Sequence, residues 1–246
     1  MASSFQTTQW SLILRIRSGD SQDSEVAMET LCRNYWLPLY SWLRAQGNSD
    51  VVAEDLTQGF FAHVIRRGIF ERADEGRGKL RSYLLTCLKN YLADEKEKDR
   101  AQKRAGKDRE VPLSFVDSEH GERQIERDLR SNEATPAEIY EYRWARTMLQ
   151  IALTRLEMEY QDRAKGELFR LLSPILIGTG GENPYARIAR QMTSSEGAVR
   201  VAYHRFKERF REVVREEVAR TLLPDETIED EMIHLAQVLD RNGKKG

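Results

Sequence analysis

Positively charged side chains are concentrated near the end of a chain whose formal net charge is only −1. Residues 185–215 contain eight basic and three acidic residues. Guanidinium and ammonium groups at this density neutralise the phosphates of nucleic acid, and an arginine also donates paired hydrogen bonds to a guanine edge. Because basic and acidic residues number 39 and 40 over the chain, any nucleic-acid surface must be local.

The order of polar and apolar residues in this stretch predicts two helices separated by a short turn. Ile188 and Ala189 are apolar positions of a short first helix, and residues 193–195 interrupt it. Ser195 is a good N-cap for the second helix, and Glu196 follows where a helix N-terminus favours an acid. We expect the second helix to bury Ala198, Val201, Ala202, Phe206, Phe210 and Val213, and to expose Arg200, His204, Arg205, Lys207, Arg209 and Arg211.

A short helix, a tight turn and a longer basic helix are typical of the DNA-binding helix-turn-helix, whose second helix enters the major groove. Small residues at Gly197 and Ala198 would let the backbone approach DNA, and Arg200 suits a guanine edge or a phosphate. The pattern leaves a second interpretation open, an amphipathic helical hairpin whose basic face is solvated.

Two other stretches have charges that suit a macromolecular partner. Residues 96–109 hold seven basic and three acidic residues. Asp50, Glu54, Asp55 and Gln58 share one face of a predicted helix, which suits a basic, partly apolar protein partner or simply a solvated surface.

Catalytic and metal-binding patterns are not found in the sequence. The histidines His63, His120, His204 and His234 are scattered and lack metal-ligand spacing. The glycine cluster of residues 177–184 lacks the lysine of a phosphate-binding loop. We therefore expect a protein that is not an enzyme and that uses no cofactor or metal.

The elements that must position these residues are all predicted to be helices, because apolar residues recur at helical spacing. Helices are expected over 26–46, 49–67, 79–104, 136–160 and 163–176, then the helix-turn-helix and a last helix over 225–241. From 117 to 141 there are eight acids and three arginines. We expect an all-α protein of two small helical bundles, 25–104 and 135–220, joined by a flexible acidic linker at 105–134, with an N-terminal extension at 1–24 and a C-terminal extension at 221–246.

The cysteines and the hydropathy indicate a cytoplasmic protein. Cys32 and Cys87 lie on apolar helical stripes and form no CxxC pattern, so we expect buried free thiols and a reducing compartment. No apolar run approaches the roughly 18 residues that span a bilayer, and the N-terminus lacks a signal-peptide cleavage site.

The stretch YARIARQMTSSEGAVRVAYHRFKERFRE resembles region four of the extracytoplasmic-function sigma factors of bacterial RNA polymerase. The family pattern there is roughly Y-x-E-I-A-x-x-L-G-x-S-E-G-x-V-K, followed by a small residue and a basic run with H-R. Thr193 stands where the family usually has a turn glycine, Ser194 where it has an apolar residue and Arg187 where it has an acid. The matching residues are Tyr185, Ile188, Ala189, Ser195, Glu196, Gly197, Val199, Arg200, His204 and Arg205.

The first bundle resembles the same family independently. DVVAEDLTQGFFAHVI is similar to its region-two helix, D-A-E-D-L-x-Q-x-x-F, and GKLRSYLLTCLKNYLADEKEKDRAQKR is similar to the segment that follows. Two blocks in this order, across residues 25–217, resemble a long form with a C-terminal extension. The resemblance implies an alternative sigma factor whose partners are core RNA polymerase, through its clamp helices and flap, and promoter DNA, with an anti-sigma factor or other regulator as a further partner.

The resemblance also implies three sets of site residues. The core-polymerase-binding set is Asp50, Glu54, Asp55, Gln58 and Phe61. The set for the minus-ten element is Lys79, Arg81, Tyr83, Lys89, Asn90, Lys96, Arg100, Lys103 and Arg104. The set for the minus-thirty-five element is Ser195, Glu196, Gly197, Ala198, Arg200, Val201, His204, Arg205 and Lys207.

Several alternatives stay open at this point. A stand-alone helix-turn-helix transcription regulator would bind duplex DNA without polymerase, often as a symmetric dimer. A helical adaptor would use its charged faces for protein contacts only. The acidic linker is either a mimic of nucleic acid in a basic channel or a passive tether. Tyr83 and Tyr91 are either base-stacking or core residues, and the C-terminal helix either inhibits the bundles or binds a partner.

Overall fold

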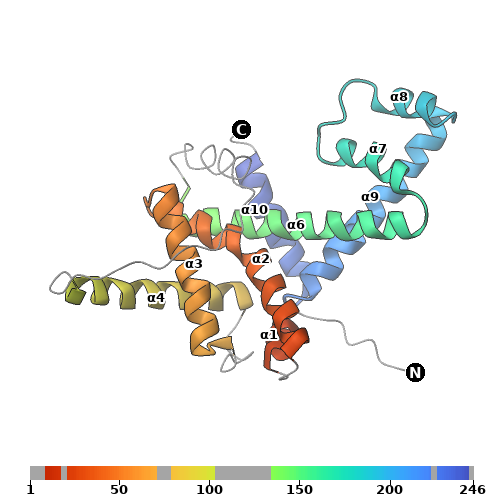
Figure 1. Cartoon of the computed structure of the whole chain (residues 1–246). Helices are drawn as coiled ribbons and strands as arrows, with labels where there is room; N and C mark the ends of the chain where they lie inside the picture. The colour runs from red at the N-terminus through yellow and green to blue at the C-terminus, as the bar shows by residue number, and fades with distance from the viewer. Residues whose placement is uncertain (1–8, 18–20, 71–78, 103–133, 223–225, 244–246) are drawn as a thin grey trace. The chain divides into compact units, whose positions relative to one another are not determined.

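The computed structural model describes residues 9–17, 21–70, 79–102, 134–222 and 226–243, and all regular structure within these ranges is helical (Figure 1). The predicted all-α class is therefore confirmed. Residues 105–133 of the expected acidic linker lie outside the described residues, so its role stays a prediction.

The chain divides into two compact units, each with its own packing. The first unit comprises Met1–Thr147 and Ala219–Gly246, and the second comprises Met148–Val218. The division falls inside helix α6 (Pro136–Asp162), whereas the sequence predicts a second bundle that starts at residue 135. The expected domain bounds and the two-bundle arrangement remain a prediction.

The first unit begins with a helix in the range where the sequence predicts only an N-terminal extension. Helix α1 (Gln9–Arg17) precedes α2 (Ser21–Ala45), and these two helices pack against each other. Leu12 and Ile13 of α1 are buried. Arg15 donates from Nε to Asp23 of α2 over 2.9 Å. A short apolar patch can therefore form a helix here because α2 covers it.

Helix α3 (Asp50–Arg67) starts and ends where the sequence predicts. The Ser49 hydroxyl accepts a hydrogen bond from the Val52 amide over 3.3 Å, as an N-cap does. Gly68 ends the helix with φ 56°, a left-handed conformation that costs glycine little. The Asn48 side chain donates to the Leu43 carbonyl over 2.8 Å and so closes the end of α2.

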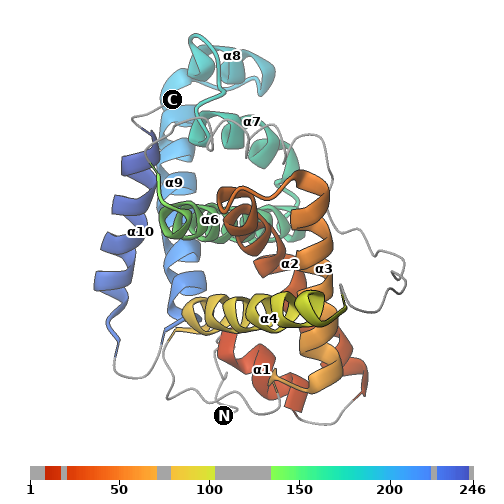
Figure 2. The same cartoon turned by 90° about the vertical axis from the view of Figure 1, so that its left-hand side faces the viewer.

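Helix α4 (Leu80–Gln102) packs on α2 and α3 (Figures 1 and 2). Tyr91 of α4 is 8% exposed, and its ring lies 6.0 Å from Phe60 and 5.2 Å from His63 of α3. A Cβ at Gly59 would meet the Tyr91 hydroxyl at 2.4 Å. Tyr91 is therefore a core residue, and the small Gly59 makes room for it.

The C-terminal helix belongs to the first unit. Helix α10 (Ile228–Gly243) is capped by Thr227, whose hydroxyl accepts from the Asp230 amide over 3.3 Å. Leu235 is 4% exposed, Met232 and Leu239 are half-buried, and Ile233 on the other side is exposed. The apolar stripe predicted for this helix is therefore covered by the chain itself.

The second unit contains the C-terminal half of α6 with α7 (Gly166–Leu176), α8 (Pro184–Gln191) and α9 (Glu196–Ala219). Its core includes an aromatic cluster: Tyr160 lies 6.1 Å from Phe169 and 5.4 Å from Phe206, between ring centroids. Upstream, the predicted capping box of α6 is present, since the Thr135 amide donates to Glu138 over 2.8 Å and the Glu138 amide donates to Thr135 over 3.3 Å.

The buried side of α9 differs from the expectation. Val199, Phe206 and Val213 are buried at intervals of seven residues, while Val201 is 53% exposed and Ala198 is also exposed. Of the other residues expected to be buried, Ala202 and Phe210 are half-buried. The buried face of α9 is thus rotated about the helix axis from the predicted one. It is centred on the line through Val199, a residue that the predicted buried face did not include.

Candidate nucleic-acid interface

The turn between α8 and α9 is closed by two backbone hydrogen bonds. The Ser194 amide donates to the Ala189 carbonyl over 2.9 Å, and the Thr193 amide donates to Arg190 over 3.4 Å. This is the Schellman arrangement, which requires a left-handed residue directly after the helix. Thr193 takes that place with φ 48°. The turn therefore keeps the geometry for which glycine is suited, although it carries a β-branched residue.

Side chains on both sides of the turn fix its ends. The Ser195 hydroxyl accepts from the Ala198 amide over 3.1 Å, so the predicted N-cap is confirmed. Arg187, which occupies a common acid position of the resembled family, donates to the Gly180 carbonyl over 3.0 Å. This bond ties α8 to the loop before it.

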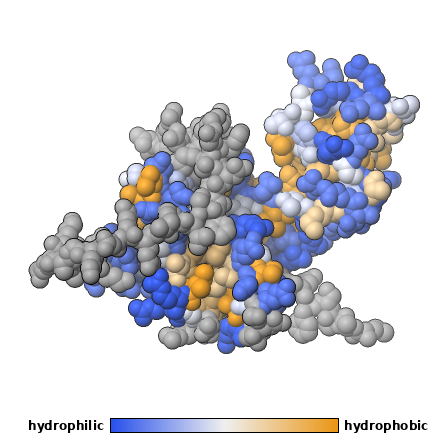
Figure 3. Space-filling view, viewed as in Figure 1, coloured by the Kyte–Doolittle hydropathy of each residue, from blue (hydrophilic) through white to orange (hydrophobic). Residues whose placement is uncertain are grey.

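The predicted DNA-reading residues lie at the start of α9, and nearly all of them are exposed. Figure 3 shows hydrophilic side chains over the end of the second unit where α8 lies. Lys207 is half-buried. The exposed members are Ser195, Glu196, Gly197, Ala198, Arg200, Val201, His204 and Arg205.

Arg200 is held in position by two neighbours. Its Nη2 atom donates to Glu196 Oε1 over 2.6 Å, and its guanidinium carbon lies 4.3 Å from the centre of the Tyr185 ring. Tyr203 in turn packs edge-on against Tyr185 at 5.7 Å. The Arg200 side chain remains 59% exposed, so it is oriented without being covered.

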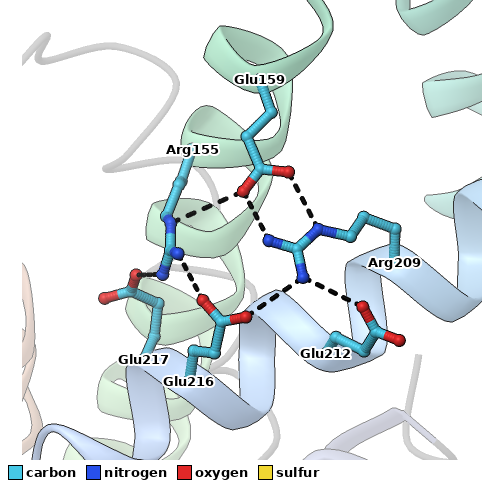
Figure 4. Close-up of polar contacts among 6 residues, drawn as sticks. All are labelled: Arg155, Glu159, Arg209, Glu212, Glu216 and Glu217. Carbon is cyan, nitrogen blue, oxygen red and sulfur yellow. Dashed lines mark hydrogen bonds and ion pairs between the residues drawn. The ribbon is translucent and has the colours of Figure 1, made fainter. Parts of the chain in front are cut away.

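Arg209 does not belong to the exposed basic face, although its spacing placed it there. Its guanidinium donates to both carboxylate oxygens of Glu159 on α6, over 2.9 and 2.7 Å, and also reaches Glu212 and Glu216 (Figure 4). Arg155 of α6 completes the network through ion pairs with Glu159 and Glu216 and with Glu217 over 2.9 Å. Spacing within α9 could not reveal this network because Arg155 and Glu159 come from another helix, α6.

The network shifts the pKa values of Glu159 and Arg209. Hydrogen bonds from Arg209 hold the pKa of Glu159 below its ordinary value, against a smaller opposing effect of burial. The same bonds raise the pKa of Arg209. Glu159 and Arg209 therefore both stay charged near neutral pH, and they join the two helices through charge-assisted hydrogen bonds.

The residues expected at the minus-ten element fall into several groups. Lys89, Asn90 and Lys96 are exposed on α4, and Lys89 lies 5.8 Å from the Trp42 ring centre. Tyr83 is half-buried, with its hydroxyl donating to the Ile69 carbonyl over 3.5 Å. Arg100 lies in α4 but its side chain is not described, and Lys103 and Arg104 lie outside the described residues.

Lys79 and Arg81 lie at the start of α4 and are engaged by acids of the same unit. Arg81 is 4% exposed, its guanidinium lies 4.1 Å from the Trp144 ring centre, and its Nε donates to Glu141 over 3.0 Å. Its Nη1 lies 2.6 Å from Glu231 of α10, and Lys79 contacts the same carboxylate. Arg81, expected near the DNA, is thus buried, because two acids and an aromatic ring surround it.

The residues expected to bind core polymerase differ in their exposure. Asp50 is exposed, and Glu54, Asp55 and Gln58 are half-buried on α3. Phe61 lies instead in the core, at 4% exposure, because its ring stacks on Trp36 with centroids 5.8 Å apart. The exposed apolar side chains beside these polar residues are Val51, 62% exposed, and Val52, 39% exposed.

The thiols have different environments. Cys32 is buried, as expected, and burial raises its pKa to about 12. Cys87, also expected to be buried, is half-buried because it lies at the margin of the α4 packing face.

The part of the chain that the structure describes contains neither a metal-binding cluster nor a membrane-spanning helix. There, no cluster of histidine, cysteine, aspartate or glutamate has the arrangement of a metal site. No helix among these residues has both the length and the apolar character to cross a membrane.

Comparison with known proteins adds no relative. No family model, no curated protein and no solved structure matches the chain. The resemblance to sigma factors therefore stays a prediction that depends on the quoted sequence blocks.

Proposed function

We propose that the chain is an alternative sigma factor, which binds core RNA polymerase and directs promoter recognition and transcription initiation. The observation that carries this proposal is the start of α9. A capped, exposed helix follows a tight turn and presents Arg200 and Arg205 away from the core. A helix presented in this way fits the major groove and reads base edges from its first turns.

Polymerase binding is the second part of the proposal. The first unit presents acids and an amide beside exposed valines on α3, a mixture that suits a basic, partly apolar helical partner. Lys89 and Lys96 on α4 are accessible for the phosphates of an opened strand. The fold class and the two compact units are compatible with separate sites for polymerase and for the two promoter elements.

Transcription in vitro tests this proposal directly. Core polymerase, inactive on its own at promoters, is mixed with the full chain and a pool of promoter-bearing fragments. Promoter-dependent transcripts are expected only when the chain is present. Duplex binding without any transcript would instead support a stand-alone helix-turn-helix regulator, and the absence of both would support a protein-contact adaptor.

A matched pair of variants locates the promoter-reading surface. Arg200→Ala with Arg205→Ala should reduce transcription at least tenfold, since each lost base or phosphate contact costs about 1–3 kcal/mol. Arg211→Ala removes another exposed arginine of the same helix, one that pairs with Glu208. Arg211 lies about 16 Å along the helix axis from Arg200. The Arg211→Ala variant should leave transcription within about twofold, and an equal loss in both would place the reading surface elsewhere.

A further inference from the structure

Helix α10 places an acid against Lys79, which directly precedes α4, and against Arg81 in the first turn of α4. Glu231 is 2% exposed and contacts both Lys79 and Arg81, the latter over 2.6 Å. A second acid, Glu226, lies 3.5 Å from the Lys79 ammonium. Burial alone would raise the pKa of Glu231, but Arg81 and Lys79 outweigh it and hold the pKa below its ordinary value.

Other contacts of α10 support this placement. Leu235, one turn after Glu231, is buried, and the ring of His234 lies 3.2 Å from Glu141 of α6. Glu141 also accepts from Arg81, so one carboxylate contacts both helices. The acids thus lie beside an apolar contact that sets the position of the helix. Together they form a docked element rather than a single surface ion pair.

A carboxylate and a phosphodiester present the same chemistry to these cations. Both are anionic oxygen acceptors that form short, charge-assisted hydrogen bonds with lysine and arginine. Glu231 therefore occupies the positions that phosphate oxygens would need in order to contact Lys79 and Arg81. Because both cations are already neutralised, nucleic acid gains from them only if α10 moves away.

We propose that α10 is an internal competitor for nucleic acid, whose acids occupy the Lys79 and Arg81 end of α4 and must leave before a single strand can bind there. This inference rests on the proposed function for the identity of the ligand, a DNA backbone. The competition itself is a property of the chain alone and is measurable without polymerase.

Glu231→Gln in the full chain is the decisive variant. Glutamine keeps the shape of the side chain, but it removes the negative charge. Anisotropy of a labelled 20-nucleotide single strand of mixed sequence should show binding at least fivefold tighter than for the unchanged chain. The slope of log affinity against log salt should also steepen, by about 0.7 for each phosphate newly contacted.

Two controls separate competition from a general charge effect. Glu229→Gln removes the same charge from an exposed position in the first turn of α10, and it should change binding by less than twofold. Adding Lys79→Ala to the Glu231→Gln chain should abolish at least half of the gain in log affinity. Equal gains for Glu229→Gln and Glu231→Gln, or a gain that ignores Lys79, would overturn the proposal.

Hydrogen exchange supplies an independent readout on the unchanged chain. Saturating single strand should accelerate exchange of the α10 amides, because the two ligands exclude one another. Unchanged or slower exchange in α10 on binding would contradict the competition. If competition is observed but transcription with core polymerase fails, the inference about α10 stands and the sigma-factor proposal is wrong. If transcription succeeds but competition is not observed, the sigma-factor proposal stands and the inference about α10 is wrong.

Discussion

Thr193 is the residue with the least favourable backbone conformation for its type in the helix-turn-helix. A β-branched side chain at φ 48° costs on the order of 1–2 kcal/mol relative to glycine. Thr193→Gly should therefore stabilise the second unit by about 1 kcal/mol, part of the gain being offset by the greater freedom of glycine in the unfolded chain. Hydrogen exchange of the α8 and α9 amides would report the local change.

Ser194→Gly is the matched control for this position. Ser194 lies next to Thr193 but is not among the residues with positive φ. Glycine there should give no stabilisation and should cost about 0.5–1 kcal/mol, the entropic penalty that glycine carries. If both variants stabilised the unit equally, strain at Thr193 would not be the cause.

Gly59 allows a second prediction at the scale of one residue. Gly59→Ala would place a methyl group 2.4 Å from the Tyr91 hydroxyl, and Tyr91 is confined by Phe60 and His63. We expect a loss of about 1–3 kcal/mol from overpacking, measured by urea unfolding, despite the higher helix propensity of alanine. Adding Tyr91→Phe should restore most of the loss because it removes the clashing oxygen.

The charged network that joins α6 to α9 illustrates how ion pairs position a helix. Arg209 is 28% exposed and makes four hydrogen bonds to three acids. Arg209→Gln should destabilise the second unit by about 1–3 kcal/mol, because partly buried acids lose their partner. Arg211→Gln breaks only an exposed pair with Glu208 and should cost less than about 1 kcal/mol. Equal losses in thermal unfolding would argue against the network.

From the same charged network we expect a particular dependence of stability on pH. The pKa of Glu159 is lowered in the folded chain by hydrogen bonds from Arg209, whereas an unfolded glutamate titrates near about 4.3. The stabilisation is therefore present above that pH and is lost as the pH falls through the lower folded pKa. Arg209→Gln should make unfolding midpoints less sensitive to pH below about 5, and an unchanged acid dependence would show that other acids dominate.

At the scale of the whole molecule, the proposed function predicts that polymerase binding and DNA binding separate. Asp55→Ala with Gln58→Ala should weaken capture of the chain by immobilised core polymerase at least tenfold and leave duplex binding unchanged. Glu25→Ala, an exposed acid of α2, is the matched control and should bind core normally. Normal capture of the Asp55 and Gln58 variant would show that the polymerase-binding surface lies on another face.

Local signals predicted most helices of the chain. Ser49, the Thr135 and Glu138 capping box and Ser195 each start a helix where the sequence indicates one. These signals are readable because the partners lie within three residues. Helix α1 escaped prediction because its few apolar residues become significant only when α2 covers Leu12 and Ile13.

The candidate sites were less predictable because partners distant in sequence decide them. In the sequence, Arg81 and Arg209 stand beside other basic residues and so look like members of an exposed basic face. Only the folded chain brings Glu231 to Arg81 and Glu159 to Arg209. Phe61 was assigned to a surface, but Trp36, which is 25 residues earlier, covers its ring. Spacing along one helix identifies a face but not the element that packs on it.

The alkylation rate of the buried Cys32 thiol reports how often the first unit opens. With a pKa near 12, it is almost wholly protonated at neutral pH, and only the thiolate reacts with alkylating agents. Iodoacetamide therefore modifies it at a rate set by how often the surrounding helices part. Mass spectrometry of the Cys32 peptide would follow this alkylation and so report how often the unit opens.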